Sequence, residues 1–377
     1  MPPVNPFLRR AQQDRAQRER QGLWRQRRCL EAIDGRTLRL EGRDYLQFAS
    51  NDYLGLAQGG ETPQSQGAGA SPLVTGYQRA HRELEQRLCE MTGYESALLF
   101  SSGFAANAAP LSLVHSGDRV LADKLSHASL IDAALASPAT LRRFPHNDMG
   151  TLARWLGNGD SPTLVVSESV FSMDGDRAPM AEMVTLCRQH GALSWFDDAH
   201  GFGVIGANGW GAAEYARPDL LTLTFGKAVG AQGAALLGPK VLIEALVQSA
   251  RHYVYSTGLS VDQAQRVLGQ LSRLAEPERR ARLWHNVERF CHRAEAAGLV
   301  LTDSQSPIVP VITGDNAATL AAFEALKAQG IWVPAIRPPT VPAGQGRLRV
   351  VINAEHRDAD IDRLVTVLAA VVGEGGV

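Results

Sequence analysis

The sequence predicts an α/β protein in which a large domain with a mostly parallel central sheet precedes a smaller C-terminal α+β domain. Short apolar segments alternate with helical segments from about residue 95 onward, which is the pattern of a parallel sheet covered on both faces. Beyond about residue 300 the predicted order changes to strand, helix, strand, strand and helix. A chain of 377 residues is long enough for about two such domains.

Residues 1–45 are predicted to form an N-terminal helical arm. Residues 1–30 contain eight arginines against two acidic residues, Asp14 and Glu19. A transit peptide or an anionic partner would explain this basic composition. A solvated amphipathic helix explains it as well and is favoured, with one or two of Arg25, Arg27 and Arg28 as candidate contacts for an anionic substrate.

The large domain is expected to span residues 46–272. Helices are expected at residues 79–91, at Ala128–Ala136 and at Met180–Gln189. Residues 59–76 are rich in Gly, Ser and Gln, so this segment either borders a site or is an ordinary surface loop. The predicted strands are short apolar runs: Ala97–Phe100, Arg119–Ala122, Thr163–Ser167, Ala192–Phe196, Leu220–Thr224 and Ala234–Leu237.

The C-terminal domain is expected to span residues 273–377. A long helical region from Val261 to Ala297 leads into it, with a break at Pro277, and residues 251–260 before it look irregular. The remaining predicted elements are, in chain order, the strand Ile308–Ile312, the helix Ala317–Gln329, the strands Trp332–Ile336 and Arg347–Asn353, and the helix Asp360–Val371.

Composition narrows the possible classes of function. The formal net charge of −1 gives no overall attraction for nucleic acids or anionic membranes. The four cysteines are scattered and form no Cys-x-x-Cys pair, which disfavours a zinc site or a disulfide framework. The longest apolar run near the C-terminus is too short to span a bilayer. We therefore expect a cytoplasmic protein with no metal, no nucleic-acid partner and no membrane partner.

A lysine, an acid and a histidine follow two of the predicted strands. Lys227 lies just after the strand that ends at Thr224, and Asp197, thirty residues before it, follows the preceding strand with His200. The carboxyl ends of parallel strands meet at one edge of an open sheet, where ligands bind. The lysine can form a Schiff base with an aldehyde, the carboxylate can keep a ring nitrogen protonated, and the imidazole can hydrogen-bond a ring oxygen. This set predicts pyridoxal 5′-phosphate as the cofactor.

Other strand ends supply further candidates for the same site. Ser102, Gly103 and Phe104 open a helix after a predicted strand, where backbone N–H groups suit the cofactor phosphate. His127 lies between a strand and a helix and can stack on an aromatic ring, and Ser172 can donate to the ring hydroxyl. Each feature also has an ordinary explanation as a helix cap, a turn or a surface residue. It is their combination that indicates a site.

One glycine-rich motif points to a different class of enzyme. Gly201, Gly203 and Gly206 fit the dinucleotide-binding pattern Gly-x-Gly-x-x-Gly. That pattern also requires a helix starting at the third glycine and a following strand that ends in an acid. Residues 207–211 are too rich in glycine for this helix, and Asp219 precedes its strand, so a dehydrogenase is disfavoured.

Two arginines of the C-terminal domain share one face of a predicted strand. Arg347 and Arg349 are two residues apart, and side chains alternate along a strand. A guanidinium on that face can hold a substrate carboxylate through two parallel hydrogen bonds. Two solvated arginines on an edge strand are the plain alternative.

Five motifs occur together in a characteristic order: Ser102–Phe104, Ser126–Ser129, Phe171–Asp176, Asp197–Gly201 and Thr224–Lys227. In this order they resemble those of the α-oxoamine synthases, which are pyridoxal-phosphate enzymes of aminotransferase-like fold (fold type I). The resemblance implies an enzyme that joins an amino acid to an acyl thioester with loss of carbon dioxide.

Residues 50–56, 314–316 and 336–344 resemble those of family members that condense L-alanine with a pimeloyl thioester in biotin biosynthesis. The sequence leaves open whether the acyl group arrives on coenzyme A or on acyl carrier protein. A sister synthase that uses glycine and a shorter acyl-CoA is the nearest alternative. A catalytically silent subunit is another, and the retention of Lys227 and Arg349 argues against it.

The resemblance also implies a role for each matching residue. It implies that Lys227, His127, Asp197 and His200 are catalytic and contact the cofactor. It implies a homodimer in which Thr257 reaches the phosphate of the second subunit. The other implied cofactor contacts are Ser102, Gly103, Phe104, Ser172 and Thr224. The implied substrate contacts are Arg25, Asn51, Thr340 and Arg349, with Arg349 on the amino-acid carboxylate.

Overall fold

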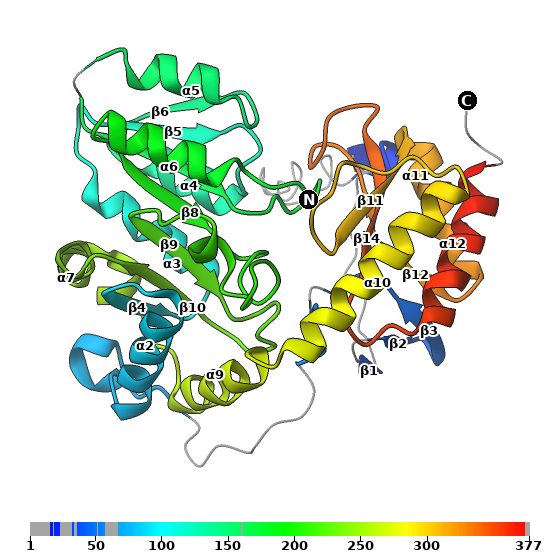
Figure 1. Ribbon diagram of the computed structural model, residues 1–377, viewed down its shortest axis with the longest axis horizontal. Coiled ribbons are helices and arrows are strands. Elements are labelled where there is room, and N and C mark those ends of the chain that lie inside the picture. Colours follow the sequence, from blue (N-terminus) through cyan, green and yellow to red (C-terminus); the bar gives the residue numbers. More distant parts are fainter. Residues whose placement is uncertain are drawn as a thin grey trace, which may run out of the picture.

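The computed structural model describes residues 16–17, 19–22, 32–33, 36–50, 52–56, 67–159 and 161–373. Figure 1 shows a large domain on the left and a smaller domain on the right, with helix α10 (Pro277–Ala296) leading from one to the other. This is the predicted α/β organisation, in which a larger sheet domain is followed by a smaller α+β domain.

The large domain is built on a seven-stranded sheet. Strand β10 is antiparallel to both of its neighbours, and every other neighbouring pair in this sheet is parallel. The predicted mostly parallel sheet is therefore confirmed. In spatial order the strands are β4 (Ser96–Phe100), β10 (Ala234–Gly238), β9 (Leu220–Thr224), β8 (Leu193–Asp197), β7 (Thr163–Glu168), β5 (Arg119–Asp123) and β6 (Thr140–Phe144).

Helices cover both faces of this sheet. Alternate residues of each strand point to opposite sides, and the apolar side chains on both sides are buried against helices. On β7, Leu164 and Val166 belong to one apolar cluster and Val165 belongs to the other. The first cluster includes residues of α3 (Gly103–Ala108), α4 (Ala128–Ala136), α7 (Lys240–Ser249) and α8 (Arg251–Val254). The second includes residues of α2 (Arg79–Thr92), α5 (Met149–Leu156), α6 (Met180–Gln189) and α9 (Val261–Leu274).

The smaller domain combines two short sheets with helices. One sheet has the order β11 (Ile308–Gly314), β14 (Gly346–Val351) and β13 (Ala335–Ile336). The other has the order β1 (Ala32–Ile33), β2 (Thr37–Leu40), β3 (Arg43–Gln47) and β12 (Ile331–Trp332). Helix α12 (Asp358–Gly373) packs against α10 and α11 (Asn316–Ala328).

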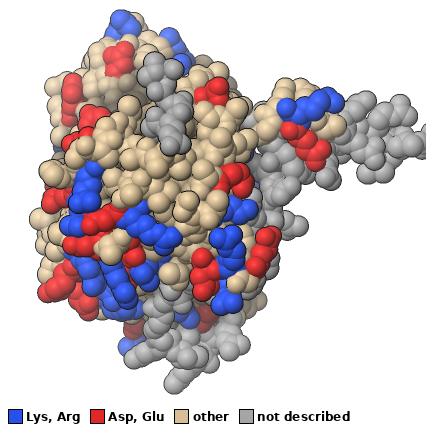
Figure 2. Space-filling view, turned by 90° about the vertical axis from the view of Figure 1, so that its right-hand side faces the viewer, with Lys and Arg blue, Asp and Glu red and all other residues tan. Residues whose placement is uncertain are grey.

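Ion pairs reinforce the contact between α10 and α12. Arg289 and Arg293 of α10 both pair with Asp362 of α12, at 2.7 and 2.9 Å. Figure 2 shows acidic and basic side chains interspersed on this side of the smaller domain, next to a broad uncharged area. Such exposed pairs each contribute only about 0–1 kcal/mol, so the apolar core is the main support of this domain.

Three parts of the secondary structure differ from the prediction. Strand β6 and helix α5 were not expected. Strand β6 lies at the edge of the sheet and carries two exposed arginines, so it does not appear in the sequence as an apolar run. The expected strand Trp332–Ile336 is divided between two sheets: β12 pairs with β3, and β13 pairs with β14. Pro334, which has no N–H to donate to a ladder, lies between them. Residues 251–260, expected to be irregular, contain the short helix α8.

Part of the predicted N-terminal arm forms strands. Strands β1 and β2 fall within residues 1–45, and the expected boundary at residue 45 falls inside β3. The division of the chain at residues 45 and 272 stays a prediction. Among the helices of the described residues, none combines the length and apolar character needed to cross a membrane.

Candidate active site

The carboxyl ends of three neighbouring strands contribute to one cavity. Glu168 ends β7, Asp197 ends β8 directly beside it in the sheet register, and Thr224 ends β9. Lys227 follows in the turn after β9, and Arg349 reaches the cavity from β14 of the smaller domain. The cavity has a volume of about 350 Å³, and its lining residues are Gly103, Phe104, Asn107, His127, Ser129, Glu168, Ser172, Met173, Asp197, Ala199, His200, Thr224, Lys227 and Arg349.

Lys227 lies against a buried histidine. Its Nζ is 2.9 Å from Nε2 of His200, and Nδ1 of His200 is 2.7 Å from the hydroxyl of Tyr53. Burial, together with the nearby positive charge of Lys227, lowers the pKa of His200 well below its ordinary value, so its ring is neutral. Burial also lowers the pKa of Lys227, against the opposing charge of Asp197. A lysine that forms a Schiff base needs this shift, because the free amine is its reactive form.

A chain of hydrogen bonds connects Asp197 to His127. The side-chain amide of Asn107, on α3, donates to Oδ2 of Asp197 at 2.7 Å and to Oγ of Ser129 at 2.9 Å. Oγ of Ser129 is in turn 2.8 Å from Nδ1 of His127. The other oxygen of Asp197 accepts from the backbone N–H of Ala199 at 2.9 Å. The chain fixes both the acid and the imidazole that are predicted to contact the cofactor ring.

Glu168 is a second carboxyl group in this site. Its side chain is buried, and Oε1 accepts a hydrogen bond from the backbone N–H of His127 at 2.6 Å. Burial, and then the charge of Asp197, raise the pKa of Glu168 well above its ordinary value. Protonation of Glu168 avoids two adjacent negative charges in a site of low dielectric constant. Through its hydrogen bond to the N–H of His127, Glu168 holds the backbone from which the His127 ring projects.

Two arginines attach the smaller domain to the loop that carries Ser172. The Nε of Arg349 donates to the backbone carbonyl of Ser172 at 2.6 Å. Arg347 donates to the carbonyl of Met173 at 3.3 Å and forms an ion pair with Asp174. Both arginines are buried, with 2% and 7% of their surface exposed for Arg347 and Arg349. The interpretation of two solvated arginines on an edge strand is therefore wrong.

The residues of the cavity fit pyridoxal phosphate. Oγ1 of Thr224 is buried and has no hydrogen-bond partner among the described residues, which is expected for a hydroxyl whose partner is a ligand. At Gly103 a Cβ atom would lie 2.6 Å from Cγ2 of Thr224, so a side chain at this position would displace Thr224 from the cavity wall. The amine of Lys227, the carboxylate of Asp197 and the imidazole of His200 supply the groups that an aldehyde-bearing pyridine requires.

Most of the residues predicted from the sequence line this cavity: Gly103, Phe104, His127, Ser172, Asp197, His200, Thr224, Lys227 and Arg349. Ser102 is the N-cap of α3, where its Oγ accepts from the N–H of Ala105 at 3.2 Å. Thr257 and Thr340 are exposed and are not among the residues that line the cavity. Arg25 and Asn51 lie outside the described residues.

Sequence reasoning missed several lining residues: Asn107, Ser129, Glu168, Met173 and Ala199. Glu168 carries the same signal as Asp197, since both residues end strands that are neighbours in the sheet. Asn107 and Ser129 carry no comparable signal, because it is the packing of α3 against α4 that brings them together.

Comparison with known proteins defines the class of enzyme. The family model "Aminotransferase class I and II" matches residues 43–368, and the chain belongs to this family. The aminotransferase-like fold (fold type I) and the cofactor pyridoxal phosphate, both predicted from the sequence, are confirmed.

The relatives narrow the class further. The chain is 46% identical over 368 residues to 8-amino-7-oxononanoate synthase of Sodalis glossinidius, covering 94% of this chain and 95% of the relative. It is 48% identical over 342 residues to the protein of the same name from Cronobacter sakazakii, covering 87% and 89%. These names confirm the predicted membership of the α-oxoamine synthases.

Solved structures agree with this placement. A serine palmitoyltransferase from S. paucimobilis with bound PLP–myriocin has a TM-score of 0.91 and 29% identity, covering 99% of this chain and all of that one. An 8-amino-7-oxononanoate synthase from Francisella tularensis has a TM-score of 0.75 and 27% identity, covering 88% of this chain and 98% of that one.

Proposed function

We propose that this chain catalyses the decarboxylative condensation of L-alanine with a pimeloyl thioester in biotin biosynthesis. The products are 8-amino-7-oxononanoate, carbon dioxide and the free thiol. The observation that carries the proposal is the convergence of Lys227, Asp197 and Arg349 on one cavity. Similarity over nearly the whole chain to proteins named 8-amino-7-oxononanoate synthase supports this reaction within the family.

The cofactor, when bound, supplies an aldehyde that combines with amines and a pyridine ring that takes up negative charge from the amino-acid α-carbon. Asp197 would hold a proton on the ring nitrogen, in the orientation that Asn107 and the N–H of Ala199 impose. His127 would stack on the ring. The remaining proposed contacts of the ring and phosphate are Ser102, Gly103, Phe104, Ser172, His200 and Thr224.

Lys227 has two proposed tasks at the same nitrogen atom. It would hold the cofactor through its aldehyde group, and as a free amine it would remove the proton from Cα of alanine. Its lowered pKa favours the free amine that both tasks require. Neutral His200, whose Nε2 is 2.9 Å from Nζ, can accept a hydrogen bond from the ammonium that forms and keep it directed at the cavity.

Arg349 would bind the carboxylate of alanine, which is the group that later leaves as carbon dioxide. Its guanidinium is buried and its Nε is held by the carbonyl of Ser172, so the fork is already oriented before substrate arrives. Thr340 is a further proposed substrate contact. Arg25 and Asn51 are proposed from the sequence alone.

The proposal extends to assembly and location. We infer a homodimer in which Thr257, exposed in the single chain, reaches the phosphate bound by the second subunit. We place the enzyme in the cytoplasm, where it would take the pimeloyl group from coenzyme A or from acyl carrier protein.

Product analysis tests the proposed reaction. The cofactor-loaded protein is supplied with L-alanine or glycine, in combination with pimeloyl-CoA, pimeloyl-acyl carrier protein or acetyl-CoA, and products are identified by mass spectrometry. The proposal predicts 8-amino-7-oxononanoate from alanine with at least one pimeloyl carrier, and no product from the Lys227→Ala variant. A preference for glycine with acetyl-CoA would overturn it and establish the sister reaction.

A further inference from the structure

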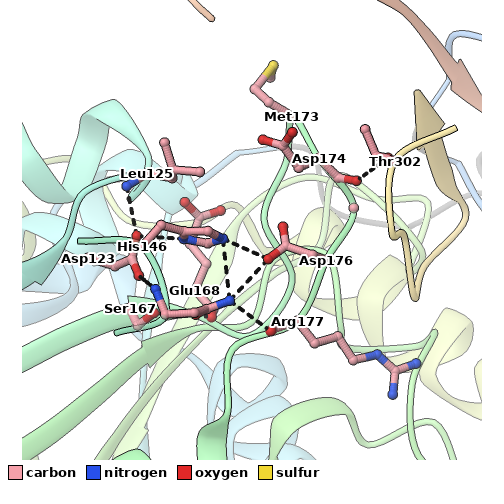
Figure 3. Close-up of polar contacts among 12 residues, drawn as sticks. Asp123, Leu125, His146, Ser167, Glu168, Met173, Asp174, Asp176, Arg177 and Thr302 are labelled. Atoms are coloured by element: carbon pink, nitrogen blue, oxygen red, sulfur yellow. Dashed lines mark hydrogen bonds and ion pairs between the residues drawn. The ribbon is translucent and has the colours of Figure 1, made fainter. Parts of the chain in front are cut away.

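His146 lies beside the cofactor site, between two carboxylates (Figure 3). Its Nδ1 is 2.9 Å from Oδ1 of Asp123, and its Nε2 is 2.7 Å from Oδ2 of Asp176. Carboxylates only accept hydrogen bonds, so both bonds form only when each ring nitrogen carries a proton. The ring of Phe171 packs edge-on against the imidazole, with ring centroids 4.4 Å apart. The geometry therefore describes an imidazolium held by two acids.

The charges around His146 support this protonation state. Burial alone would lower the pKa of His146, but the hydrogen bonds and charges of Asp123 and Asp176 raise it to about 10. The neighbouring Asn147 is neutral, and the next residue, Asp148, caps α5 through Thr151. Since a histidine stays protonated below its pKa, His146 carries a positive charge throughout the neutral range.

On one side, His146 is tied to the turn that carries His127. Asp123 ends β5, and its Oδ1 also accepts from the backbone N–H of Leu125 at 2.8 Å. Its backbone carbonyl accepts from the N–H of Ser126 at 3.1 Å, and His127 follows directly. Asp123 thus orders the turn from which the predicted ring-stacking residue projects.

On the other side, His146 is tied to the loop that carries Ser172. The backbone carbonyl of Asp176 accepts from the N–H of Phe171 at 2.9 Å, which closes the loop. Within it, Ser172 holds Arg349 through its carbonyl, and the carbonyl of Asp174 accepts from Thr302 of the smaller domain at 2.9 Å. Asp176 thus orders the loop that meets both the cofactor site and the smaller domain.

We propose that His146 is a positioning residue whose positive charge fixes the His127 turn and the Ser172 loop relative to each other. It contacts neither reacting group itself and acts through Asp123 and Asp176. The inference rests on the proposed cofactor contacts of His127 and Ser172. Without the cation, the carboxylates of Asp123 and Asp176 would keep only neutral donors, such as the backbone N–H and the side-chain amide of Asn147, and their repulsion would move the two segments apart.

The His146→Gln variant, with His190→Gln as its matched control, tests the proposal. His190 is an exposed histidine at the end of α6. Hydrogen exchange is followed by mass spectrometry, with and without cofactor, in peptides covering residues 123–130 and 168–177. In His146→Gln we expect both segments to exchange about tenfold faster while the rest of the chain is unchanged. We also expect the cofactor dissociation constant to rise about tenfold and the visible circular dichroism of the bound cofactor to fall.

A second substitution separates charge repulsion from a simple loss of packing. Adding Asp176→Asn to His146→Gln removes the repulsion, so we expect slower exchange and a partial return of the circular dichroism signal. If His146→Gln does not fold, Asp176→Asn alone is used, and faster exchange in residues 168–177 is expected. Histidine NMR provides an independent readout, since at about pH 8.5 His146 should be an imidazolium.

Three results would overturn the proposal: unchanged exchange in both segments of His146→Gln, a double variant no better than the single one, or a neutral His146 at about pH 8.5. These outcomes are distinct from a failure of the proposed function. A wild-type protein that binds no pyridoxal phosphate would refute the proposed cofactor contacts. Hydrogen exchange in the cofactor-free protein would still report on whether His146 holds the two segments together through Asp123 and Asp176.

Discussion

Replacing Asn107 with alanine should weaken cofactor binding, although the proposed role of Asn107 is to hold Asp197. Asn107 is 1% exposed, and its amide donates to Asp197 at 2.7 Å and to Ser129 at 2.9 Å. The substitution removes both donors at once. Asp197 keeps the N–H of Ala199 but loses the bond that orients Oδ2, and Ser129 loses its link to the acid.

The size of the effect follows from these two bonds. A hydrogen bond to a charged group contributes about 1.5–3 kcal/mol, and a neutral one about 0.5–1.5 kcal/mol. The free energy of unfolding should therefore fall by about 2–4.5 kcal/mol, the sum of the two. If the charged bond alone affects the cofactor, its dissociation constant should rise ~10–150-fold, since each 1.4 kcal/mol is a factor of ten.

Titration of the cofactor-free protein with pyridoxal phosphate, followed by tryptophan fluorescence, measures this effect. Asn208→Ala is the matched control, because Asn208 is exposed, its amide donates to Glu214 at 3.2 Å, and neither residue is among those that line the cavity. Ser129→Ala should weaken binding less, and the double variant should fall short of the sum because the two residues share a bond. An Asn107→Ala dissociation constant within about twofold of the wild type would refute the reasoning.

Three further changes test other parts of the site. Arg349→Lys should raise the KM for alanine about 10–100-fold, because lysine lacks the two-pronged fork that grips a carboxylate, and steady-state kinetics showing an unchanged KM would contradict this. Gly103→Ala should weaken cofactor binding in the same fluorescence titration, since the added Cβ would lie 2.6 Å from Cγ2 of Thr224. The kcat with alanine should rise with pH through a midpoint below the ordinary lysine value of 10.5, because the free amine of Lys227 is the acting form in the enzyme–substrate complex and burial lowers its pKa. A rise with its midpoint at or above that value would rule the assignment out.

Much of the sheet could be predicted because its strands are buried on both faces. Such strands appear in the sequence as continuous apolar runs, and the helices that join them, such as Ala128–Ala136 and Met180–Gln189, have the predicted bounds. Strand β6 escaped prediction for the opposite reason: it lies at the edge, and its arginines are exposed. The division between β12 and β13 depends on which sheet each residue joins, which is a tertiary property that a local pattern does not carry.

The residues of the site likewise fall into those that the sequence predicts and those that only the packed structure reveals. Asp197, Thr224 and Lys227 follow strands, and parallel strands bring such residues to one edge. Asn107 and Ser129 belong to two helices, so their link between Asp197 and His127 exists only once those helices pack. The cationic role of His146 was equally hidden, because Asp123 ends strand β5 whereas Asp176 lies in the loop after β7.

The identity of the lysine that bonds to the cofactor tests the account most directly. The chain contains four lysines: Lys124, Lys227, Lys240 and Lys327. Borohydride reduction of the cofactor-loaded protein makes the bond permanent, and peptide mass spectrometry then locates it. We expect a reduced pyridoxyl group on Lys227. The same group on another lysine, or on none, would contradict it.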